Sequence, residues 1–259
     1  MIGLSNATRN TALSAEIGQR TLLGVLTPSS NTVLEPITCS MLAPLADVSA
    51  HFARFRVKEI ALDDSALGQF DSSPILAAAC LLADAKVDSI VWSGTSSGWL
   101  GFASDEELCR QITAATGVAA SSSVLGLNET FTRTAVRRFA LVSPYLANVQ
   151  EKIIANYARA GFECVAERHL SDRDNFSFSR HSEVTIAELI RDVAKAGPDA
   201  ITVFCTNMRG AGVVAELEQE IGIPIYDTVA TGVYSGLQLA GDDPTRIKDW
   251  GRLFEANLA

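Results

Sequence analysis

The sequence predicts an α/β protein of two pseudo-symmetric lobes, each a parallel sheet flanked by helices, with a ligand site in the cleft between them. Three observations support this prediction. Short apolar runs alternate along the chain with longer segments of helical periodicity. The apolar runs are almost continuous, as in strands that are buried on both faces of a parallel sheet. The same order of elements also occurs twice, once in each half of the chain.

The individual elements follow from these patterns. The predicted strands are Leu22–Leu26, Val48–Phe55, Val87–Trp92, Phe139–Val142, Cys164–Arg168, Ala200–Cys205 and Ile223–Tyr226. The predicted helices are Val33–Leu45, Pro74–Ala85, Asp105–Ala115, Leu125–Val136, Tyr145–Ala160, Glu183–Ala196, Val213–Ile221 and Thr228–Leu239. Ser104 is predicted to cap the helix that begins at Asp105, and Gly117 to end it.

The chain divides into two similar halves, Thr21–Ala119 and Arg138–Tyr226, each of which runs strand, helix, strand, helix, strand. We expect the segment from Thr228 onward to pack back on the first half. The N-terminal residues are polar and lack the apolar stretch of a signal peptide. The predicted units are a polar leader (1–20), lobe 1 (21–119 together with 227–259) and lobe 2 (120–226).

Composition excludes several function classes. The chain carries 21 lysines and arginines against 30 acidic residues, a formal net charge of −9, so no nucleic-acid partner is expected. The longest apolar run, Ile75 to Ala83, is about half of a membrane span, so no membrane segment is expected. Five scattered cysteines without a CxxC pair and three histidines in unrelated segments favour reduced thiols and no metal site. These features predict a cytoplasmic protein.

Motifs for nucleotide cofactors and for serine hydrolases are poorly matched. There is no GxxxxGK[ST] segment, and Gly210-Ala-Gly212 lacks the third glycine of a dinucleotide-binding loop, so no cofactor of this kind is expected. Gly94-Thr-Ser-Ser-Gly98 has the GxSxG form. However, no histidine follows His181 to complete a catalytic triad.

Polar residues cluster just after the first and third strand of each half, where ligands bind in open α/β sheets. Two lobes that face each other would bring four such loops into one cleft. In the loop 94–98, small residues let backbone N–H groups approach an anion, and Thr95 and Ser96 add hydroxyl donors. The four loops are 27–31, 94–98, 143–145 and 205–207.

Cys205 is the one cysteine placed for reactivity, because it ends a predicted strand just before a helix, and helix N-termini lower the pKa of a thiol. Tyr145 either donates a hydrogen bond into the cleft or only packs in the core. Asn31 with Ser30 either binds a ligand or only caps a helix. Arg209 either approaches an anionic substrate or is a solvated helix residue.

Taken together, the loops resemble those of the aspartate/glutamate racemase superfamily, and within it the maleate isomerase and arylmalonate decarboxylase branch, over about residues 21–245. Residues 23–35, LGVLTPSSNTVLE, are similar to the opening segment of maleate isomerases, in which the asparagine, here Asn31, holds a substrate carboxylate. Residues 205–209, CTNMR, are similar to the second-cysteine motif of this group. The resemblance implies two lobes that place one cysteine on each face of the reacting carbon, without a cofactor.

The first of these cysteines is absent. Racemases and isomerases of the branch have Cys-Thr-Ser where this chain has Gly94-Thr95-Ser96, whereas arylmalonate decarboxylases have Gly-Thr-Ser and a single cysteine in the second half. By that likeness, Thr95, Ser96 and Tyr145 hold a carboxylate that becomes an enediolate, and Cys205 protonates it on one face. Since relatives carry cysteine at position 94, we expect the loop to accommodate Gly94→Cys. The other predicted substrate contacts are Asn31, Ser30, Gly94, Ser97, Thr206 and Asn207.

The sequence therefore predicts a cofactor-independent carbon-acid enzyme that acts on a small carboxylate or dicarboxylate, foremost a decarboxylase resembling arylmalonate decarboxylase. An isomerase or racemase with altered chemistry is the alternative within the enzyme class, and a non-catalytic carboxylate-binding paralogue is the alternative outside it. The Ser-Ser-Asn loop differs from the apolar opening segment of the decarboxylases and favours a polar diacid. A small carboxylate substrate is thus the expected partner, and a homo-oligomer is left open.

Overall fold

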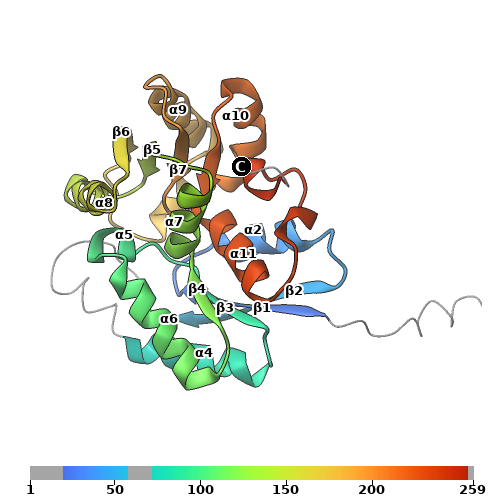
Figure 1. The fold of residues 1–259 in the computed structure, drawn as a ribbon. Helices are drawn as coiled ribbons and strands as arrows, with labels where there is room; N and C mark the ends of the chain where they lie inside the picture. Colours follow the sequence, from blue (N-terminus) through green and yellow to red (C-terminus); the bar gives the residue numbers. More distant parts are fainter. Residues whose placement is uncertain (1–19, 58–71, 256–259) are drawn as a thin grey trace, which may run out of the picture.

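The computed structural model describes residues 20–57 and 72–255. The predicted leader 1–20 lies outside this part of the chain except for its last residue. Two four-stranded sheets, one from each half of the chain, form the framework (Figure 1). All of their strand pairs are parallel, as the continuous apolar runs predicted.

The first sheet has the strand order β2-β1-β3-β4, and the second has the matching order β6-β5-β7-β8. The inner strand β3 is buried along its whole length, whereas the edge strand β2 is half-buried along most of its own. The strands are β1 (Thr21–Pro28), β2 (Val48–Phe55), β3 (Ser89–Trp92), β4 (Ala120–Ser122), β5 (Arg138–Ser143), β6 (Glu163–His169), β7 (Ala200–Val203) and β8 (Ile225–Asp227).

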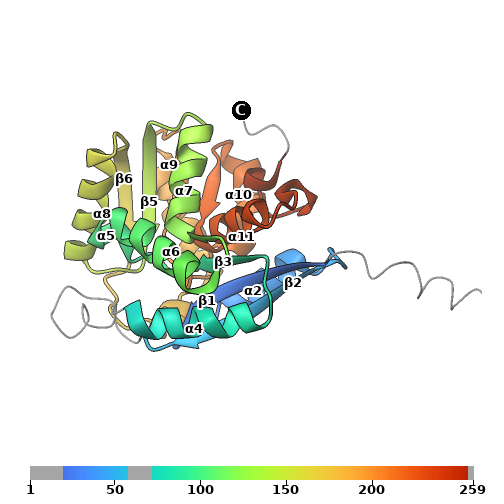
Figure 2. The same cartoon turned by 60° about the horizontal axis from the view of Figure 1, so that its bottom comes forward.

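Helices cover both faces of each sheet (Figure 2). On the first sheet α4 packs with α6, and α2 packs with α11; on the second sheet α8 and α9 contact the strands and α10 contacts β8. The α-helices are α2 (Leu34–Leu42), α4 (Ser72–Asp84), α5 (Ser97–Leu100), α6 (Ala103–Thr116), α7 (Ser123–Arg133), α8 (Ala147–Arg159), α9 (Glu183–Ala194), α10 (Val214–Ile221) and α11 (Thr228–Leu239). Short 3₁₀ turns are η2 (Ser177–Arg180), η3 (Ala211–Val213), η4 (Pro244–Arg246) and η5 (Arg252–Phe254).

Besides the 3₁₀ turns, one strand and one α-helix were not predicted. Strand β4 has the sequence Ala-Ser-Ser and pairs with β3, so the first sheet extends three residues past the predicted boundary at residue 119. Helix α5 is only four residues long. The predicted cap at Ser104 is wrong, because α6 begins at Ala103 and the Ser104 hydroxyl donates to the carbonyl of Gly101 instead. Gly117 ends α6 in the left-handed conformation, as predicted.

The C-terminal helix α11 packs on the first sheet, against β3 and β4, although it follows the second half in sequence. Its approach is close. A Cβ at Gly236 would lie 2.3 Å from Leu23 Cδ1 and 2.7 Å from Val91 Cγ2, and the Ser89 hydroxyl donates to the Gly236 carbonyl over 2.8 Å. The contact therefore requires glycine at this position.

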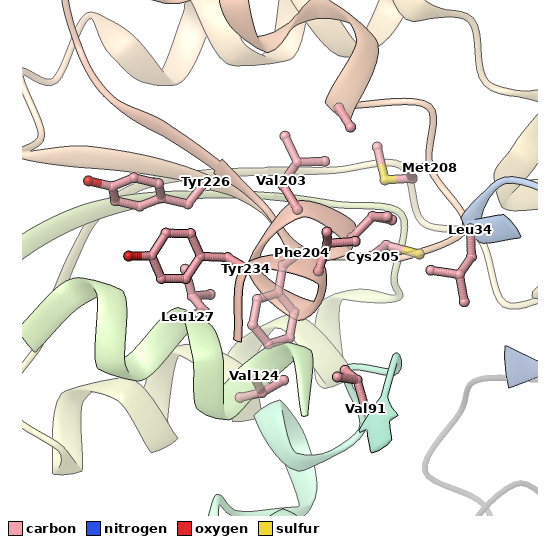
Figure 3. Close-up of a cluster of buried hydrophobic side chains, with 14 of the residues drawn as sticks. Leu34, Val91, Val124, Leu127, Val203, Phe204, Cys205, Met208, Tyr226 and Tyr234 are labelled. Atoms are coloured by element: carbon pink, nitrogen blue, oxygen red, sulfur yellow. The ribbon is translucent and has the colours of Figure 1, made fainter. Parts of the chain in front are cut away.

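The two halves share one hydrophobic core. In Figure 3, Val91 of β3 and Val124 of α7 lie on one side of Phe204, and Val203 and Tyr226 from the second half lie on the other. Cys205 and Met208 lie at the same end of this cluster, near Leu34. The loop that carries Cys205 is thus fixed by the core that joins the halves.

Candidate active site

A narrow cavity lies where the loops after β1, β3, β5 and β7 converge. It measures about 310 Å³ including its open mouth. Its lining mixes hydroxyl, amide and thiol groups with apolar surface. The lining residues are Pro28, Val57, Trp92, Gly94, Thr95, Ser96, Trp99, Tyr145, Asn175, Cys205 and Thr206.

The Gly-Thr-Ser loop after β3 supplies the hydroxyl donors of the cavity. The Thr95 hydroxyl lies 2.6 Å from the Tyr145 hydroxyl. Ser96 is 5% exposed and lines the cavity, and its hydroxyl has no hydrogen-bond partner among the described residues. Ser97 points away from the cavity and donates to the Asp105 carboxylate over 2.7 Å. Two hydroxyls of this loop are thus available at the cavity, and the third anchors the loop.

Asp105 holds the loop from behind. It is buried and also accepts hydrogen bonds from Ser122, over 2.5 Å, and from the Trp92 side chain. Burial raises the pKa of Asp105 to about 6, although the bonds from Ser122, Ser97 and Trp92 all act to lower it. The carboxyl group is therefore a structural acceptor for three donors around one end of the loop.

Tyr145 follows β5 and comes from the second half of the chain. Its ring packs edge-on against Trp99 and Phe178, with centroid separations of 5.2 Å and 5.6 Å. Burial raises the pKa of Tyr145 well above its usual range, so the phenol stays protonated. Because it also hydrogen-bonds to Cys205, the phenol joins the Thr95 hydroxyl to the thiol across the cavity.

Cys205 is 2% exposed, and burial raises the pKa of its thiol to about 12. The Asn207 backbone N–H, which lies 3.4 Å from the sulfur, and the Tyr145 hydroxyl both lower the pKa of the thiol, but the effect of burial is larger. The predicted lowering by a helix N-terminus is therefore wrong. β7 ends at Val203 and α10 begins only at Val214, so no helix dipole points at the sulfur. At neutral pH the group is a thiol and not a thiolate.

A second buried carboxyl group, Asp227, lies behind the Cys205 loop at the end of β8. Its Oδ1 accepts from the Val229 N–H over 2.8 Å, whereas its Oδ2 has no hydrogen-bond partner among the described residues. Burial raises the pKa of Asp227 to about 7. The electrostatic interaction of Asp227 with Cys205 adds to the raised pKa of the thiol.

Four predicted substrate contacts do not line the cavity: Ser97, described above, and Asn31, Ser30 and Asn207. The Asn31 side chain caps α2 through the Leu34 N–H (2.9 Å) and donates to the Thr206 hydroxyl (3.2 Å). Ser30 and Asn207 belong to hydrogen bonds that join the two halves of the chain. Asn207 accepts from the Thr32 N–H, and Ser30 accepts from Asn175. Of the predicted contacts, Gly94 and Thr206 do line the cavity, with Thr95, Ser96, Tyr145 and Cys205.

Arg209, whose role the sequence left open, donates to the carbonyl of His181 over 3.5 Å and does not line the cavity. Sequence reasoning missed five of the lining residues. Trp92 was assigned only to a strand, and its position two residues before Gly94 was a usable signal. For Asn175, in an irregular segment between β6 and α9, no sequence pattern gave a signal. The missed residues are Pro28, Val57, Trp92, Trp99 and Asn175.

Only neutral groups line the cavity: among the described residues no aspartate, glutamate, lysine, arginine or histidine contributes to its wall. Across residues 20–57 and 72–255, no cluster of His, Cys, Asp or Glu could hold a metal ion, and no helix is long and apolar enough to cross a membrane. Hydroxyl and amide donors can bind a carboxylate, and the thiol can give up a proton to a strongly basic carbon.

Comparisons with known proteins place this arrangement in context. A family model described as arylmalonate decarboxylase matches residues 33–254. Maleate isomerase of Pseudomonas putida is 26% identical over 235 residues, which cover 86% of this chain and 92% of that protein. Arylmalonate decarboxylase of Bordetella bronchiseptica is 26% identical over 165 residues, or 62% of this chain and 69% of that protein. The crystal structure of a maleate isomerase from Pseudomonas putida has a TM-score of 0.83 at 20% identity and covers 91% of this chain and 98% of that one, so the two proteins share a fold.

Proposed function

The chain belongs to the arylmalonate decarboxylase family, and on that premise we propose that it is a cofactor-independent decarboxylase of malonate-type dicarboxylates. In the proposed reaction the bond between the α-carbon and one carboxylate breaks and CO₂ leaves. The electron pair stays on the α-carbon and delocalises into the other carboxylate as an enediolate. Cys205 transfers its thiol proton to that carbon. Water then returns a proton to the thiolate and leaves hydroxide, which combines with the released CO₂ as bicarbonate.

The observation that supports this proposal most is a protonated thiol and a set of neutral hydroxyl donors around one cavity. A thiol with a pKa of about 12 is a poor nucleophile at neutral pH, but an enediolate carbon is basic enough to take its proton. Thr95 and Ser96 are held in place by the loop before charge develops, as in an oxyanion hole. Burial that keeps Cys205 protonated therefore suits a proton donor.

Tyr145 links the two parts of the proposed mechanism. The Tyr145 hydroxyl contacts both Thr95 and Cys205. The same phenol can therefore interact with the negative charge that develops on the enediolate and with the charge left on the Cys205 sulfur. A donor that also hydrogen-bonds to the sulfur stabilises the thiolate formed when the proton leaves. We therefore assign Tyr145 to the binding of the enediolate and to the stabilisation of the thiolate.

A second candidate is cis–trans isomerisation of a maleate-type diacid. The observation in its favour is the identity with maleate isomerase, which extends over 86% of this chain, against 62% for arylmalonate decarboxylase. Gly94 argues against it, because a mechanism with a cysteine on each face of the substrate lacks its first group there.

A substrate panel tests the two candidates against each other. The protein is incubated separately with malonate, methylmalonate, phenylmalonate and maleate, and CO₂ release and fumarate formation are measured. The proposal requires CO₂ from at least one malonate and no fumarate. Fumarate without CO₂ would replace the proposal by the second candidate, and neither product would contradict both. Cys205→Ala should abolish the activity, and Cys39→Ala, which removes an exposed thiol on α2, should leave it unchanged.

A further inference from the structure

Trp92 occupies an unusual place in the wall of the cavity. It ends β3, is 2% exposed, and packs against Phe55 with a ring-centroid separation of 5.1 Å. Its side chain also hydrogen-bonds to the buried Asp105. The indole is therefore fixed from two directions, by an aromatic neighbour and by a carboxyl group.

The indole fills the space beside Gly94. A Cβ added at Gly94 would lie 2.0 Å from Trp92 Cζ2 and 2.4 Å from Cη2, far inside van der Waals contact. The backbone of Gly94 is not in the left-handed region, so it is this space, and not the conformation, that requires glycine. The predicted tolerance of Gly94→Cys is therefore wrong for this chain as long as Trp92 keeps its position.

Trp92 also separates two cavities. On its far side lies a second cavity of about 600 Å³ including its open mouth, lined among others by Ile75, Leu100, Asp105 and Leu108. Within residues 20–57 and 72–255, Trp92 and Ser96 alone line both cavities. The ring is thus a partition between the narrow cavity and a roomier space.

We propose that Trp92 is a specificity-determining residue, whose ring limits the α-substituent of the substrate to a small group such as hydrogen or methyl and keeps any side chain at position 94 out of the cavity. The inference about the substituent rests on the proposed function. The inference about packing does not. The indole fills the space beside Gly94, so an aryl substituent directed toward that space would collide with it, and the space beyond Trp92 is closed to it.

A thermal double-mutant cycle tests the packing directly and needs no substrate. Gly94→Ala should lower the melting temperature by roughly 3–10 °C, because the new methyl group overpacks against the indole. In the Trp92→Leu background the same change should cost less than half as much. In the Phe55→Leu background, in which the indole and its bond to Asp105 remain, it should cost more than in Trp92→Leu. Equal costs in all three backgrounds would overturn the proposal.

A substrate comparison tests specificity. The ratio of kcat/KM for phenylmalonate to that for methylmalonate should rise at least about tenfold in Trp92→Leu and stay unchanged in Phe55→Leu. An unchanged ratio in Trp92→Leu would overturn the assignment of specificity. If no malonate is turned over, the proposed function fails. Calorimetric binding of phenylmalonate then decides the inference: tighter binding by Trp92→Leu than by the wild type supports the partition, and equal or weaker binding refutes it.

Discussion

The loop after β3 and the loop after β7 occupy corresponding places in the two sheets, yet their chemistry differs. The first loop presents hydroxyl groups, has no side chain at Gly94, and is anchored by an aspartate that accepts three hydrogen bonds. The second presents one buried thiol and is backed by an aspartate with one unpartnered oxygen. In a duplicated architecture, one half can thus bind the negative charge that develops on the substrate, while the other half delivers a proton.

The largest effect should come from the second loop. Cys205→Ala removes the proposed proton donor, and we expect kcat to fall by about 10²–10⁴-fold, the usual contribution of general acid catalysis. Circular dichroism and the melting temperature should stay close to those of the wild type. Full activity in this variant would show that the thiol is structural and that the proposed mechanism is wrong.

The first loop should give the next largest effect. Thr95→Ala and Ser96→Ala should each lower kcat by about 10²–10³-fold with a smaller change in KM, because these donors act on charge that appears in the transition state. Thr95→Ser, which keeps the hydroxyl, is the matched control and should retain most of the activity. A rise in KM with unchanged kcat would assign these hydroxyls to ground-state binding instead.

The asymmetry between the loops should also be visible in stereochemistry. With one proton donor, the wild type should protonate one face of the α-carbon, so methylmalonate decarboxylated in D₂O should give 2-deuteropropionate of one handedness, and the α-protons of added propionate should not exchange. Gly94→Cys combined with Trp92→Leu should gain slow exchange, since a second thiol then has room on the first-half side. Gly94→Cys alone should show less exchange than the double variant. Racemic 2-deuteropropionate, or fast exchange of the propionate α-protons by the wild type, would reveal a second base and contradict the single-donor mechanism.

The smallest effect concerns the aspartate behind the second loop. Burial raises the pKa of Asp227 to about 7, so the folded protein binds a proton that the unfolded chain releases near pH 4. This group therefore lowers the free energy of unfolding as pH rises from about 4 to 7. Asp227→Asn keeps the helix cap and does not titrate, so its stability relative to the wild type should increase as pH rises through this window. Urea denaturation at several pH values measures the difference, and a pH-independent difference would contradict it.

Much of the fold could be predicted because strands in parallel sheets are apolar almost throughout. Val48–Phe55 and Thr228–Leu239 have the predicted bounds, and the other predicted elements differ by a few residues at their ends. Strand β4 was not predicted because its sequence, Ala-Ser-Ser, has no apolar pattern. The strand is defined only by its pairing with β3. Local sequence does not encode such a pairing.

The candidate site was predicted less completely, for a different reason. Residue type indicates which hydrogen bonds a side chain can make, but not which groups of the folded protein are its partners. Asn31 was expected to bind substrate, and its amide is used to cap α2 and to reach Thr206. For Cys205, position before a helix suggested a lowered pKa, whereas burial, which depends on the whole core, raises it. Trp92 matters through the space it fills, and that space exists only once the loop is folded beside it.

The position of helix α11 near the end of the chain constrains when the first sheet can be completed during synthesis. The helix that covers one face of the first sheet lies near the end of the chain, and its close fit at Gly236 against Leu23 and Val91 is specific. While the ribosome produces the second half, that face of the first sheet is covered in part by α2 but lacks α11. We therefore expect a nascent first half to expose apolar surface, which favours aggregation, until residue 239 emerges. The duplicated halves are therefore not interchangeable as folding units.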